Sequence, residues 1–152
     1  AFAPQDIPLT LAPAEVYRLS VPGHGEVAFR ALSMGNPHAV ITVADVSSAP
    51  VATLGPALQA LPAFPESVNV GFMAVLARDA IALRVYERGA GETLACGSGA
   101  CAAVVSGIQA GLLDAHVQVR VPGGQLAVRW AGGDAPVWLA GDTDTVYRGE
   151  LL

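Results

Sequence analysis

Lysine is absent from the 152 residues, and all eight basic side chains are arginines. Without lysine this chain cannot form a Schiff base, which excludes pyridoxal phosphate chemistry or class I aldolase chemistry carried by this chain alone. Charged residues make up only 14% of the sequence, against a usual share of about 25%. So few charges indicate that another structure covers part of the surface.

A basic excess and long apolar runs are also missing. The net charge of −5 argues against nucleic acid as a partner. A membrane-spanning helix needs about 18 apolar residues, whereas Val70–Ala77, among the longest apolar runs, ends at Arg78. The first residues lack the basic and apolar segments of a signal peptide. We therefore expect a single soluble, cytoplasmic domain over residues 1–152, with no membrane partner.

The chain has only two cysteines, Cys96 and Cys101. Five residues along an α-helix separate two Cα atoms by about 8–9 Å, whereas a disulfide needs less than about 7 Å. We therefore expect free thiols, in keeping with a reducing compartment. Cys101 lies about 140° around the helix from Cys96, so it cannot face the same ligand and is interpreted as a core residue.

Short β-rich runs separated by turns fill most of the chain. Val51–Leu61 has helical spacing, and Cys96–Leu113 is small and apolar on nearly every side, as in a buried helix. The sequence predicts an α+β fold in which a mixed or largely antiparallel shell of about eight or nine strands surrounds this central helix, with the other helix outside. The predicted strands are Val16–Val21, Glu26–Leu32, Ala39–Val43, Val68–Leu76, Ala80–Glu87, His116–Val121, Gln125–Trp130, Val137–Leu139 and Thr145–Tyr147.

The most informative stretch, Glu87–Ala100, combines a strand end, a glycine-bearing loop, a cysteine and the start of the central helix. The first amides of a helix lack internal partners and carry partial positive charge, so Gly97–Gly99 would admit a carboxylate or phosphate. The same field would lower the pKa of the Cys96 thiol, and Glu87 would accept or relay a proton if it lies beside that thiol. A buried structural cysteine beside a tight turn is the alternative.

Other polar residues give weaker signals. Gly35–His38 offers an amide and an imidazole, although a plain turn capped by its asparagine is the alternative. His24 and His116 stand alone and are interpreted as surface or hydrogen-bonded histidines. No spacing of histidine, cysteine and carboxylate residues is typical of a metal site, so we expect no metal.

Three segments closely resemble diaminopimelate epimerase, namely Met34–Val40, Asn69–Phe72 and Glu87–Ala103. They occur in the family's order, and the resemblance extends over nearly the whole chain. Proline racemases and hydroxyproline epimerases share the fold but carry a shorter lead into their cysteine. The longer lead Glu87–Thr93 therefore favours the diaminopimelate branch.

The resemblance implies a cofactor-independent epimerase that interconverts LL- and meso-diaminopimelate, with two β-rich domains that each contribute one catalytic cysteine. Cys96 matches the cysteine of the carboxy-terminal domain, Glu87 the acid that partners it, and His38 a histidine associated with the other cysteine. The amides of Gly97 and Ser98 would contact the carboxylate at the reacting carbon, and Glu87 is also expected to contact the substrate. The residues that match those holding the distal end of the substrate are Asn36, Asn69 and Arg88.

Family members run to roughly twice this length, and the chain matches only their second half. The resemblance therefore implies that the amino-terminal domain, which carries the second cysteine, is the missing partner. We expect the isolated chain to be inactive or nearly so. We also expect it to self-associate as a homodimer through the face that the missing domain would cover.

Two other functions stay open at this stage. One is a cysteine hydrolase or acyltransferase that uses Cys96 and His38, with Asn36 or Glu87 as the third group. The other is a carboxylate-binding module of the same fold that does no chemistry.

Overall fold

The structure of the protein is a computed structural model that describes residues 1–150. These residues form nine strands, two α-helices and one short 3₁₀ helix. None of the helices there is long and apolar enough to cross a lipid bilayer. In chain order the elements are η1 (Pro4–Asp6), β1 (Tyr17–Val21), β2 (Gly25–Ser33), β3 (Pro37–Thr42), α1 (Val51–Gln59), β4 (Asn69–Ala77), β5 (Ala80–Glu87), β6 (Gly91–Thr93), α2 (Gly97–Gln109), β7 (His116–Val121), β8 (Gly124–Arg129) and β9 (Trp138–Gly141).

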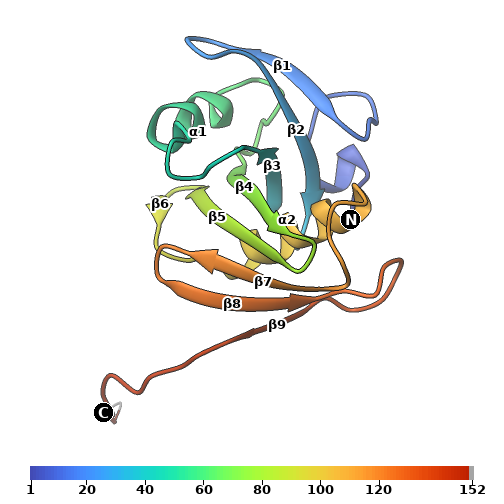
Figure 1. Ribbon diagram of the computed structural model, residues 1–152. Coiled ribbons are helices and arrows are strands. Elements are labelled where there is room, and N and C mark those ends of the chain that lie inside the picture. Colours follow the sequence, from blue (N-terminus) through green and yellow to red (C-terminus); the bar gives the residue numbers. More distant parts are fainter. Residues whose placement is uncertain (151–152) are drawn as a thin grey trace.

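One curved sheet connects all the strands in the order β1-β2-β3-β4-β5-β7-β8-β9, with β6 paired to β5 off this path. β3 pairs with β4 in parallel, as does β5 with β7, and the other pairs are antiparallel. The sheet wraps around α2, while α1 lies outside it (Figure 1). The predicted α+β fold, with a mixed β shell, a central helix and one outer helix, is therefore confirmed.

The two faces of the sheet bury separate cores, because successive side chains of a strand point to opposite faces. Val70 and Phe72 of β4 pack in the outer core with Leu54 and Leu58 of α1, whereas Met73 packs in the inner core against α2. The inner face of α2 is lined by small residues, so strands approach it from several sides. The fully buried ones are Ala100, Ala102, Ala103 and Val104.

Several details differ from the prediction: η1 was not predicted, and α1 ends at Gln59 rather than Leu61. β6 was not predicted because a three-residue strand is too short to show alternation. α2 ends at Gln109 rather than Leu113, since the chain turns at Gly111, whose φ is +71°. Thr145–Tyr147 forms no strand: residues 142–150 run away from the body (Figure 1), and Tyr147 is 85% exposed, so the expected pairing was wrong.

Candidate active site

Cys96 caps the amino terminus of α2, the central helix. Its backbone is extended (φ −134°, ψ 108°), and its Sγ accepts a hydrogen bond from the Gly99 amide at 3.4 Å. The thiol thus takes the place that a serine or aspartate usually has at an N-cap. The side chain is only 5% exposed. Its sulfur therefore lies at the positive end of the helix, as the sequence predicted.

Glu87 ends β5 directly beside this thiol. The Cys96 S–H donates to Glu87 Oε2 across 3.1 Å, and the hydroxyl of Thr93 donates to Oε1 of the same carboxylate. The predicted neighbourhood of Glu87 and Cys96 is therefore present. It gives the thiol proton a defined acceptor.

A second row of polar groups reaches the thiol from β3. Asn36, just before β3, donates from Nδ2 to Ser98 Oγ across 3.2 Å and accepts with Oδ1 from His38 Nε2 at 3.0 Å. Because Ser98 Oγ accepts from Asn36, its own proton is free for Cys96 Sγ, 3.7 Å away. A chain of polar contacts thus runs from His38 to the thiol.

Asn69 forms hydrogen bonds that connect the start of β3 with the end of β5, the strands that carry His38 and Glu87. From the start of β4 its Nδ2 donates to the Pro37 carbonyl at 3.0 Å, while its Oδ1 accepts from the Arg88 amide at 2.9 Å. Asn69 is 3% exposed, so the structure uses it to position β3 and β5. The guanidinium of Arg88 is exposed and donates to the Glu66 carbonyl at 3.0 Å. The predicted contact of Asn69 and Arg88 with substrate stays a prediction.

Every residue predicted for the site is therefore gathered at one end of the sheet, around the start of α2. Thr93 was missed by sequence reasoning. Its only signal was its place in the loop before the cysteine, and nothing in that spacing shows that a hairpin returns it to the strand end.

The ionisation of Cys96 differs from the prediction. Burial raises the pKa of the Cys96 thiol, and the hydrogen bond to Glu87 raises it further, while the Gly99 amide and Ser98 hydroxyl act in the opposite direction. The expected thiolate was wrong for this state of the molecule, because neither the burial of the sulfur nor its distance to the Glu87 carboxylate can be read from the residue pattern. Cys96 rests as a thiol whose proton points at Glu87.

His38 is a neutral, buried histidine. Burial lowers its pKa to about 4, the charge of Glu87 opposes that shift, and the charge of Arg88 adds to it. Since Asn36 Oδ1 faces His38 Nε2, the neutral ring carries its proton on Nε2. In the described residues no hydrogen bond links His38 to Cys96. This geometry does not support the cysteine–histidine pair of a hydrolase.

The pKa of His38 predicts a loss of stability in mild acid. The unfolded histidine takes up a proton below about pH 6.5, but the folded one only near pH 4, so the free energy of unfolding falls as the pH drops through that window. Between pH 7 and pH 5 the loss is about 2 kcal/mol. Urea unfolding at both pH values measures it.

The control for this prediction is His116, which is exposed. We expect His38→Gln to remove most of the difference between the two pH values and His116→Gln to keep it. An equal pH dependence in wild type and His38→Gln would show that the histidine is not buried in its neutral form.

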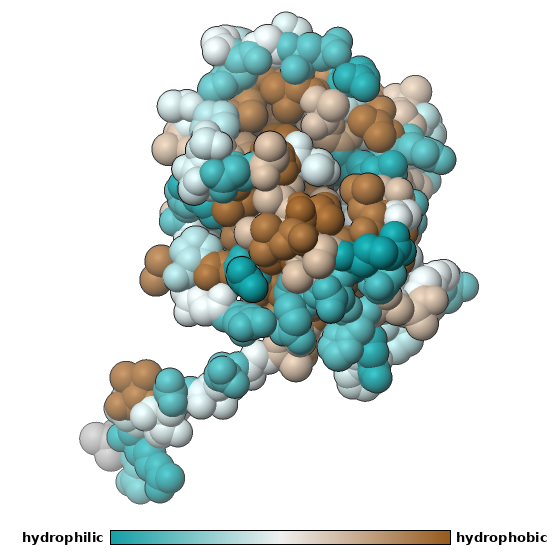
Figure 2. Space-filling view, in the orientation of Figure 1, coloured by the Kyte–Doolittle hydropathy of each residue, from teal (hydrophilic) through white to brown (hydrophobic). Residues whose placement is uncertain are grey.

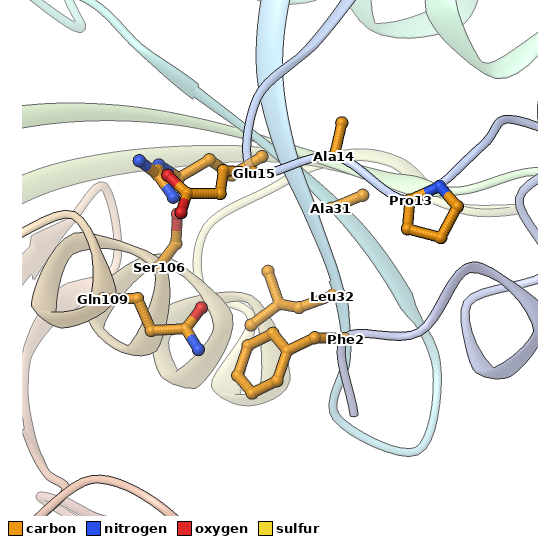
Figure 3. A pocket seen from close by; sticks show the side chains of 9 residues that line it. Phe2, Pro13, Ala14, Glu15, Ala31, Leu32, Ser106 and Gln109 are labelled. Carbon is orange, nitrogen blue, oxygen red and sulfur yellow. The ribbon is translucent and has the colours of Figure 1, made fainter.

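Both cysteines are free thiols, as predicted. Cys101 packs against the inner core but is half-buried rather than buried, so its assignment as a core residue is confirmed in part. A separate cavity of about 520 Å³ lies toward the other end of α2, where Phe2, Leu32 and Ser106 line it (Figure 3). It contains none of the predicted site residues.

Known proteins match most of this chain in sequence. Residues 30–147 match the family model of diaminopimelate epimerase. The diaminopimelate epimerase of Chromobacterium violaceum is 55% identical over 99% of this chain, and that of Nitrosomonas europaea is 53% identical over the same share. The chain covers 54% of each relative. It therefore spans about half the length of the curated relatives that it matches.

Solved structures share the fold at low sequence identity. A hydroxyproline epimerase from Agrobacterium vitis, with bound trans-4-hydroxy-L-proline, superposes with a TM-score of 0.59 at 17% identity over 75% of this chain and 40% of its own. A probable proline racemase from Agrobacterium radiobacter gives 0.58 at 17% identity over the same shares. The family match over residues 30–147 and the relatives that are more than 50% identical show that the chain belongs to the diaminopimelate epimerase family.

Proposed function

We propose that this chain is one catalytic domain, the carboxy-terminal one, of a two-domain isomerase that interconverts LL- and meso-diaminopimelate. The observation that carries the proposal is the Cys96 thiol at the start of α2, 3.1 Å from Glu87 Oε2. Cys96 is then one of the two acid–base groups that exchange a proton with the α-carbon of the substrate. No cofactor takes part.

Inverting an α-carbon requires a proton acceptor on one face and a proton donor on the other. Cys96 rests as a thiol and is the donor in the direction in which the other face is deprotonated. When its proton passes to the carbon, the Gly99 amide and the Ser98 hydroxyl stabilise the thiolate that remains. In the reverse direction this thiolate removes the α-proton.

The start of α2 also serves the carboxylate next to the reacting carbon. The first amides of a helix have no partner within it, and in the described part of the chain no acceptor is bonded to those of Gly97 and Ser98. They can therefore donate to the substrate carboxylate and to the enediolate that forms from it. Their fixed dipoles need no rearrangement as that charge develops.

We assign the binding of the distal end of the substrate to Arg88 and Asn36, which lie at the edge of the site. The exposed guanidinium of Arg88 offers a planar fork for the second carboxylate, and the amide of Asn36 lies beside Ser98 at the site. Asn69 contributes mainly by holding β3, β4 and the start of the Arg88 loop in register.

We assign the second thiol to another domain, because Cys101 is half-buried and packs against the inner core. Large apolar side chains stay exposed close to Cys96: Leu94 is 70% exposed, and Leu139, 46% exposed, lies against Gly97. Figure 2 shows apolar areas on one face of the molecule. Exposed apolar surface beside a reactive group is typical of an interface. The missing amino-terminal domain is the partner that we assign to it.

The test is to restore the missing half. A chimera joins this chain to the amino-terminal half of the Chromobacterium violaceum relative, and the interconversion of LL- and meso-diaminopimelate is followed by chromatography of the stereoisomers. We expect turnover by the chimera and none above background by this chain alone. A folded chimera that binds diaminopimelate without interconverting it would contradict the proposal.

A further inference from the structure

We propose that Thr93 is a positioning residue that holds the Glu87 carboxylate toward Cys96, and that the Arg84–Glu92 ion pair holds Thr93 in place. The proposal rests on the proposed function only in that it gives Glu87 and Cys96 their chemical roles. It concerns a hydroxyl and an ion pair that themselves lie outside the proton transfer.

The hairpin of β5 and β6 brings Thr93 back to the strand end. Val85 is paired with Thr93 and Glu87 with Gly91, so Thr93 and Glu87 are diagonal neighbours on one face of the hairpin. Gly91 has a φ of +78°, a conformation that favours glycine. Because Gly91 has no side chain opposite Glu87, the Glu87 carboxylate has room to extend toward Thr93. The tight turn therefore requires this glycine.

Each oxygen of the Glu87 carboxylate has its own donor. The Thr93 hydroxyl binds Oε1, and the thiol of Cys96 binds Oε2. A glutamate side chain has several rotatable bonds, and Glu87 is only half-buried, so without Thr93 the carboxylate can turn toward solvent. The hydroxyl selects the rotamer in which Oε2 faces the sulfur.

A strand of three residues needs support from elsewhere, and the opposite face of the hairpin provides it. Arg84 Nε lies 2.7 Å from Glu92 Oε1 and its Nη2 lies 3.0 Å from Oε2, a bidentate pair. Arg84 Nη1 also donates to the Val46 carbonyl at 2.8 Å. Both side chains of the pair are less than one-third exposed. This ion pair fixes β6 on β5, and with it the neighbouring Thr93.

The experiment measures the pH dependence of Cys96 alkylation by iodoacetamide, followed by intact mass, in a Cys101→Ala background. Thr93→Val removes the hydroxyl and keeps the shape of the side chain. We expect the apparent pKa of Cys96 to fall by about half a unit or more, in the direction given by Glu87→Gln, because the thiol loses its acceptor. Thr93→Ser should keep the parent profile.

Two further variants complete the test. Thr42→Val removes an exposed threonine from the end of β3 and should change nothing. Glu92→Gln should move the profile in the same direction as Thr93→Val but by less, since it weakens the support and keeps the hydroxyl. If circular dichroism shows that Thr93→Val does not fold, Glu92→Gln supplies the test instead.

A parent-like profile for folded Thr93→Val, while Glu87→Gln shifts, would overturn the role of Thr93. A parent-like profile for Glu92→Gln would overturn the role of the ion pair. Neither readout needs epimerase activity. A parent-like alkylation profile would therefore not contradict the proposed function, and an inactive chimera would not contradict the positioning role of Thr93.

Discussion

In the two-domain chimera, we expect Cys96→Ala to lower kcat for interconversion by about 10³-fold, within the range that a single acid–base group contributes to catalysis. The loss follows because one face of the α-carbon no longer has a proton donor or acceptor. Initial rates from both stereoisomers measure the effect.

Cys101→Ala is the matched control, since it removes the other thiol of the chain, which packs against the inner core. Its activity should stay within about twofold of the parent, because Cys101 packs against the inner core and has no hydrogen bond to Glu87 in the described structure. If the two cysteine variants lost activity equally, the damage would be structural and the role of Cys96 would be refuted.

Glu87→Gln has the second-largest expected effect. The amide still fills the space beside Thr93 and Cys96, but it carries no charge and accepts the thiol proton more weakly. We expect kcat of the chimera to fall by about 10²-fold, with a smaller change in KM because the substitution keeps the size of the side chain and removes only its charge. Steady-state kinetics on LL-diaminopimelate separates the two constants.

The same substitution moves the ionisation of Cys96 in a known direction. Since Glu87 raises the pKa of the thiol both by hydrogen bonding and by its charge, Glu87→Gln should shift alkylation of Cys96 to lower pH. Glu26→Gln, at an exposed ion pair with Arg18, is the control and should leave both kcat and the profile unchanged. An alkylation profile that moved to higher pH would contradict the assigned partnership.

Residue patterns were enough to predict the helices and strands whose pattern extends over many residues. The all-round apolar character of the segment after Cys96 predicted the buried helix, and the short β-rich runs separated by turns predicted most of the strands. The segment Thr145–Tyr147 has strand-like residues but no neighbouring strand in the described structure, so the prediction of a strand from its composition was wrong. Pairing is a tertiary property that a three-residue pattern does not contain.

The site residues also divide into those that a sequence motif reveals and those whose roles depend on the tertiary structure. Cys96, Glu87 and His38 were found because each belongs to a motif that the family resemblance covers. The direction of the Cys96 pKa was missed because the helix amides were visible in the sequence, whereas the burial of the sulfur and the distance to Glu87 were not. Thr93 was missed for a related reason: its contact depends on the register of β5 and β6, in which Val85 pairs with Thr93 and Glu87 with Gly91.

The central claim is that Cys96 serves one face of the α-carbon and that a thiol from another domain serves the other. The most direct measurement is the entry of deuterium at the α-carbon of LL-diaminopimelate in deuterated water, followed by mass spectrometry. We predict label in the product of the chimera and no exchange above background with this chain alone. Exchange by the monomeric chain at a rate close to that of the chimera would contradict the claim.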